Sequence, residues 1–131
     1  MNIDGALSLI HEDIERPPLR EASHRLAEYI YAHHKEIHHL SYSRIAQIIQ
    51  SYDPSVVLGV TQYCTGDRLN LLKMKFELIV GDETIELEDE DVYFAETHGY
   101  LIHPSSGEEL HDYKGYVYPF FIPGQAVTQN D

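Results

Sequence analysis

The first half of the chain has the hydrophobic spacing of α-helices. One long stripe of positions, three or four residues apart, predicts a helix over residues 19–40 with its charged side chains in solvent. Its members are Leu19, Ala22, Leu26, Ile30, His33, Ile37 and Leu40. Before it, apolar residues at helical spacing predict a short helix that Asp4 would cap and Pro17-Pro18 would end. This short helix is expected either to act as a dimerisation arm or to pack on the protein's own core.

Capping residues mark two further helices after the long one. Ser41 is placed to cap a helix in which Ile45, Ala46 and Ile49 face inward. Asp53-Pro54 provides a cap and a first-turn proline for the next helix, which we expect to end near Cys64.

The hydrophobic period changes to two after Leu69, which is the spacing of β-strands. A strand to Val80, a Gly81-Asp82 turn and a second strand predict a β-hairpin. A short acidic helix from Asp89 and three further extended segments follow. Pro119 favours a sheet edge for the last strand, because proline cannot donate a ladder hydrogen bond.

These elements predict one α+β domain over residues 1–124, with helices first and then a small, mostly antiparallel sheet containing one short helix. Residues 125–131 are expected to form a disordered tail. The segment LSYSRIAQII, at 40–49, resembles the second helix of winged helix-turn-helix domains, in which a capping hydroxyl precedes an Ile-Ala pair. The resemblance covers about residues 19–88 and implies a three-helix unit followed by a β-hairpin wing.

Charge separates the two halves of the sequence. The formal net charge is −13 with His neutral, and residues 76–113 contain twelve Asp and Glu but no Lys or Arg. Such a surface opposes non-specific binding to nucleic acid and either keeps the protein soluble or selects a basic partner. The acidic N-terminus and the single cysteine, Cys64, favour a cytoplasmic protein. No apolar run is long enough to predict a membrane helix.

The favoured hypothesis is a non-catalytic regulatory or adaptor protein that binds another protein. No phosphate loop, nucleophile motif or zinc-ribbon spacing occurs, so we expect neither enzymatic activity nor a cofactor. The helix from Pro54 would contact the partner through neutral side chains, namely Ser55, Thr61 and Gln62. A second candidate surface is aromatic and consists of Tyr113, Tyr116 and Tyr118, unless these side chains pack in the core.

The alternative hypothesis is a DNA-binding regulator in which four cationic side chains contact phosphates, and a homodimer would double this set. These are Arg44, Arg68, Lys73 and Lys75. The neutral helix from Pro54 and the acidic hairpin tip both oppose it. A third, weaker hypothesis is an acidic mimic of DNA. Finally, His34 and His38 would share one face of the predicted long helix and are the candidates for a metal site, although two ligands do not complete one.

Overall fold

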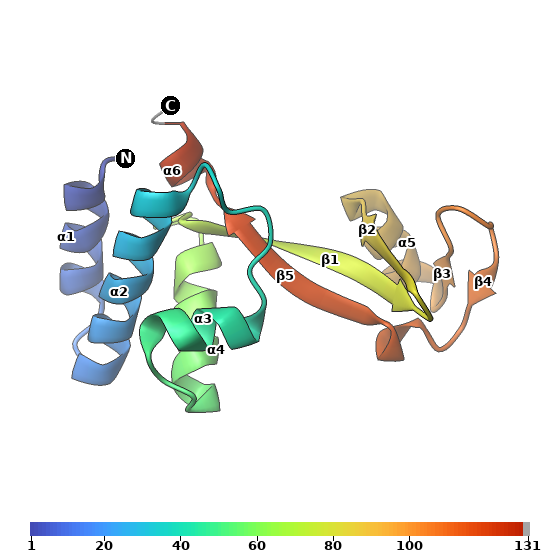
Figure 1. Ribbon diagram of the computed structural model, residues 1–131, viewed down its shortest axis with the longest axis horizontal. Helices are drawn as coiled ribbons and strands as arrows, with labels where there is room; N and C mark the ends of the chain where they lie inside the picture. The colour runs from blue at the N-terminus through green and yellow to red at the C-terminus, as the bar shows by residue number, and fades with distance from the viewer. Residues whose placement is uncertain (130–131) are drawn as a thin grey trace. The chain divides into compact units, whose positions relative to one another are not determined.

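The computed structural model describes residues 1–129 and has the predicted α+β class, with N-terminal helices followed by a small antiparallel sheet (Figure 1). The helices are α1 Ile3–Asp13, α2 Pro17–His33, α3 Tyr42–Ile49, α4 Pro54–Thr65, α5 Asp89–His98 and α6 Gln125–Thr128, with a short 3-10 helix, η1, at Tyr113–Gly115. The strands are β1 Leu72–Val80, β2 Glu83–Leu87, β3 Leu101–Ile102, β4 Glu109–Leu110 and β5 Val117–Pro123.

The chain divides into two compact units where the sequence analysis expects a single domain. The helical unit consists of Met1–Met74 together with the chain from Phe121 onward. The inserted unit is the continuous segment Lys75–Phe120. Each unit buries a separate cluster of apolar side chains, which is the physical basis of the division.

The helical unit is built on α2, which packs against α1, α3 and α4 (Figure 1). The inward-facing residues of these helices are the ones that the periodicity predicts; Leu26, Ile30, Ile45 and Ile49 are completely buried. Gly59 lets α4 approach the start of α2, because a Cβ there would lie 3.1 Å from Leu19 Cδ1. The order of α2, α3 and α4 is compatible with the winged-helix resemblance.

Two predicted helix boundaries are wrong. The side chain of Asn2, and not of Asp4, caps α1 by accepting a hydrogen bond from Gly5 N at 2.8 Å. The predicted long helix ends at His33 instead of residue 40. After it the chain turns, and Leu40 pairs with Phe121 through two backbone hydrogen bonds of 2.8 Å. A helical Leu40 could not form this bridge.

The end of the described chain is part of the core, so the predicted disorder from residue 125 is wrong over α6. Val127 is 1% exposed, and Ala126 N donates to Asn70 O at 3.1 Å. At the opposite end, the Met1 ammonium donates to Ala126 O at 3.3 Å. Residues 130 and 131 of the predicted tail lie outside the described residues.

The inserted unit contains the predicted hairpin, with β1 and β2 antiparallel and Leu78 opposite Ile85. The small core beneath it comprises Leu78, Leu87, Ala95 and Leu101. The helix α5 begins with a capping box between Glu88 and Asp91, and it ends at Gly99, whose φ of 83° suits glycine. The sheet order β2-β1-β5 leaves β5 at an edge, as Pro119 predicts.

No helix within residues 1–129 combines the length and the apolar character needed to cross a membrane.

The close approach of Gly124 to Asn70 and Leu71 allows the packing of the helical unit to be tested. Gly124 N donates to Leu71 O at 2.8 Å, and an added Cβ would lie 2.4 Å from Asn70 O. Replacing Gly124→Ala should therefore lower the free energy of unfolding by about 1–3 kcal/mol, measured by urea denaturation. The matched control is Gly115→Ala, where a Cβ meets no atom within 4 Å. Equal effects of the two substitutions would contradict this packing.

Candidate functional site

Local hydrogen bonds hold both ends of the short helix α3. Ser41 Oγ caps α3 by accepting from Arg44 N at 3.1 Å. At the other end of α3, Gln50 adopts a left-handed conformation with φ 59°, and Ser51 N donates to Ala46 O at 3.1 Å. These contacts fix where the chain leaves α3.

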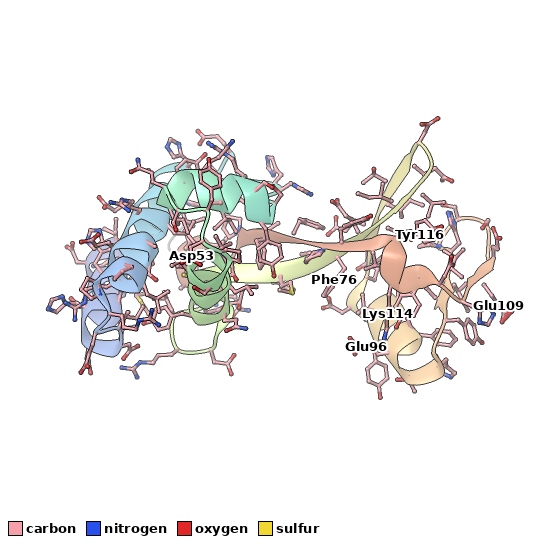
Figure 2. The ribbon with its side chains drawn as sticks, turned by 90° about the horizontal axis from the view of Figure 1, so that it is seen from below. Asp53, Phe76, Glu96, Glu109, Lys114 and Tyr116 are labelled. Atoms are coloured by element: carbon pink, nitrogen blue, oxygen red, sulfur yellow. The ribbon has the colours of Figure 1, made fainter. Side chains whose placement is uncertain are left out.

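Asp53 then starts α4, and Figure 2 labels it at the beginning of that helix. Its carboxylate accepts from Ser55 Oγ at 2.8 Å and from Ser55 N at 3.0 Å. These two hydrogen bonds hold the pKa of the Asp53 carboxyl below its usual value, with a smaller contribution from Arg16. Both capping predictions, Ser41 and Asp53, are confirmed.

An open, apolar groove of about 300 Å³ lies between α3 and α4. We call it the α3–α4 groove; its lining is Tyr42, Ser43, Ala46, Tyr52, Pro54, Val57 and Leu58. Ala46 and Val57 are buried, whereas Leu58 is 48% exposed and Tyr52 is 73% exposed. Tyr42 is fixed by an edge-to-face contact with Phe121, with ring centroids 5.2 Å apart. The groove thus has a packed floor and exposed apolar rims.

The predicted contact residues lie on α4, which forms one wall of the groove, but none of them lines it. Of these three residues, Ser55 and Gln62 are exposed. Thr61 is 2% exposed and donates to Leu58 O at 3.0 Å, so it cannot contact a partner. The missed residues are Tyr52 and Leu58. Their signal in the sequence is that both are large apolar residues outside the inward-facing stripe.

The four predicted phosphate-binding cations lie in different surroundings. Arg44 contacts Tyr29 and Gln47, while Arg68 Nε is 2.6 Å from Asp13 Oδ2, with Glu12 also within ion-pair distance. Lys75 belongs to the inserted unit and lies 3.3 Å from Glu86. Lys73 is exposed on β1. Each of the four therefore has different neighbours, and Lys75 belongs to a different unit from the other three.

The pair Asp13–Arg68 is a link between α1 and the chain after α4. Asp13 accepts from both Arg68 and Tyr63, and these hydrogen bonds lower the pKa of the Asp13 carboxyl. The pKa of the Tyr63 hydroxyl is raised, mainly because the group is partly buried and, to a smaller extent, because it is hydrogen-bonded to Asp13. The guanidinium of Arg68 is therefore already used in holding the helical unit together.

The predicted aromatic surface is only partly exposed. Tyr113 packs against the core of the inserted unit, and its hydroxyl donates to Ala95 O at 3.4 Å. Tyr116 and Tyr118 are exposed, and Tyr118 donates to Gly115 O at 3.2 Å. In the same unit, Phe76, Glu96 and Lys114 line a hollow of about 360 Å³ (Figure 2).

The histidine pairing expected on α2 does not form. His34 lies in the turn after α2, with Nδ1 3.3 Å from Tyr31 O, and His38 lies beyond that turn. The two residues therefore do not share one helix face. His33, expected on the apolar stripe, has a half-exposed side chain 3.6 Å from Glu36. No group of three or more metal-ligating side chains occurs within residues 1–129.

Comparisons with known proteins identify no relative: no protein-family model, curated protein or solved structure matches the chain.

The Asp53 cap predicts an acid-dependent loss of stability. A carboxyl whose pKa is lowered by folding stabilises the native state above its unfolded pKa, 3.8, and loses that effect as the pH falls through the folded pKa. Asp53→Asn should remove this part of the pH dependence, measured by thermal denaturation between neutral pH and about pH 2. The exposed Asp67→Asn is the control; an unchanged acid profile in Asp53→Asn would contradict the prediction.

Cys64 should be unreactive in the native state. It is completely buried, and burial raises the pKa of its thiol to about 12. At about pH 8 a disulfide reagent should modify it only through unfolding, so labelling should accelerate with added denaturant. Rapid labelling without denaturant, followed spectrophotometrically, would show that the side chain is accessible.

Proposed function

We propose that the protein is a non-catalytic interaction module whose α3–α4 groove binds an apolar side chain of a partner protein. The observation that carries this proposal is the open apolar groove between Tyr52 and Leu58. Protein interfaces typically concentrate their binding energy in such pockets, where an aromatic or aliphatic anchor is desolvated. A regulatory role in the cytoplasm, on a winged-helix-like scaffold, is part of the same proposal.

Several features support a protein partner over DNA. The exposed side of α4 presents Ser55, Leu58 and Gln62, which carry no charge, and no lining residue of the groove is Lys or Arg. A helix that enters the major groove needs donors for bases and phosphates. Arg68, a predicted phosphate ligand, is paired with two carboxylates instead. The DNA-binding alternative therefore lacks a positively charged surface around α4.

The inserted unit adds a charge preference to this proposal. It contains twelve Asp and Glu and two lysines, Lys75 and Lys114. Lys75 is itself paired with Glu86. Such a segment favours a partner with a basic region and repels nucleic acid, by long-range electrostatics that salt screens.

The test is a selection of peptides against the full chain. Peptides chosen from a random library should carry large apolar residues and should shift the backbone NMR signals of Tyr52 and Leu58. Replacing Leu58→Glu places a charge on the groove's rim and should weaken binding of the selected peptides by at least about tenfold. Fluorescence anisotropy of each labelled peptide measures this change.

The matched control is Gln62→Glu, which adds the same charge to an exposed site on α4 outside the groove. It should change the dissociation constant by less than about twofold. Equal binding by the wild type and Leu58→Glu would reject the groove as the binding site. Nanomolar, salt-sensitive binding to duplex DNA would instead support the alternative function.

A further inference from the structure

We propose that a second site, on the opposite side of α3, binds a carboxylate presented by an acidic segment of a partner protein. This site is a hollow of about 560 Å³ between α2 and α3, which we call the arginine hollow. Its lining is Arg25, Glu28, Tyr29, Ala32, Arg44, Ile48 and Gln50. None of these residues lines the α3–α4 groove, so the inference goes beyond the function proposed above.

Neutral groups hold both arginines of the hollow in place. Arg44 Nη1 donates to Gln47 Oε1 at 3.1 Å, and its Nη2 donates to Tyr29 OH at 3.1 Å. The guanidinium carbon of Arg44 also lies 5.5 Å from the centre of the Tyr29 ring, which is within the range of a cation–π contact. Arg25 Nη1 donates to Ile49 O at 3.1 Å. These contacts orient each guanidinium without neutralising it.

The charges of these two arginines are not balanced by an ion pair within the described residues. This differs from Arg68, which contacts Asp13 and Glu12. Glu28 is the one carboxylate of the lining, and its Oε1 lies 2.8 Å from Nδ1 of His24. Two fixed guanidiniums with unused N–H donors in one hollow match the forked geometry of a carboxylate.

Gln50 supplies a further donor at a strained position. Its φ of 59° lies in the left-handed region, where glycine or asparagine is usual at the end of a helix. Glutamine gains nothing from this backbone conformation, yet its side chain lines the hollow. An amide N–H there can donate to the same anion as Arg25 and Arg44.

A carboxylate fits this site better than the phosphates of a nucleic acid. Nucleic-acid binding depends on many phosphate contacts spread along a backbone. Here the two unpaired guanidiniums occupy a single hollow, in a chain with a net charge of −13. One carboxylate on a partner needs only such a local site, whereas a nucleic-acid duplex needs cations spread along its backbone.

The experiment is an NMR titration of the full chain with an acetylated, amidated tetraglutamate, observing the arginine Nε–H signals. Tetraglutamine and a DNA duplex of about 20 base pairs are the parallel probes. The Arg25 and Arg44 signals should shift saturably with tetraglutamate and remain unchanged with tetraglutamine. Absence of saturable shifts, or tighter saturation by the duplex, would overturn the proposal.

Substitutions test which donors form the site. Arg44→Gln should weaken tetraglutamate binding by about tenfold, as should Arg25→Lys, which keeps the charge but loses the fork. Gln50→Gly should raise the melting temperature by relieving the strained backbone, yet weaken binding by about threefold. A structural role alone would not separate stability from binding in this way. Unchanged binding in these variants would remove the three residues from the site.

Lys35→Gln is the matched control, because it removes a positive charge from an exposed lysine outside the hollow. It should change the dissociation constant by less than about twofold, and equal weakening with Arg44→Gln would indicate non-specific charge attraction. Leu58→Glu should leave tetraglutamate binding intact. This variant separates failure of the arginine hollow from failure of the α3–α4 groove.

Discussion

The backbone bridge between Leu40 and Phe121 is the contact on which the helical unit depends. Each residue donates its N–H to the carbonyl of the other at 2.8 Å, and Phe121 is completely buried. The bridge lies between the end of α2 at His33 and Ser41, the residue that caps α3. Through the ring contact of Phe121 with Tyr42, it also positions one wall of the α3–α4 groove. The Leu40–Phe121 bridge therefore contributes both to the fold of the helical unit and to the geometry of the groove.

The short helix α3 separates two surfaces of different chemistry. On one side it adjoins the apolar groove through Ala46, and on the other it presents Arg44 to the arginine hollow. Local caps at Ser41 and Asp53 fix the first turn of α3 and of α4, the two helices that border these surfaces. On our two proposals, the groove would receive an apolar side chain and the arginine hollow a carboxylate, in addition to any basic region that the acidic inserted unit attracts. Preorganised sites of this kind lose little entropy on binding.

The sequence predicts those features whose causes are local. The caps at Ser41 and Asp53, the turn at Gly81-Asp82 and the edge position of Pro119 all follow from neighbouring residues, and the structure contains each of them. The extended conformation of Leu40, which the periodicity assigns to a helix, was not predictable in this way, because Leu40 pairs with Phe121 far along the chain. The hollows were missed for the same reason, since their walls come from separate helices. Tyr52 and Leu58, large apolar residues outside the buried stripe, are the local signal of the groove.

The insertion of Lys75–Phe120 into the helical unit has a consequence for synthesis on the ribosome. The inserted unit is complete as a sequence before Phe121, Gly124 and Val127 have been made. Part of the apolar surface of the helical unit therefore stays exposed until residues from Phe121 onward emerge from the ribosome. Contacts between distant residues also form slowly, which prolongs the interval in which a nascent chain can aggregate. The inserted unit thus makes the nascent helical unit depend on residues that are synthesised last among its own.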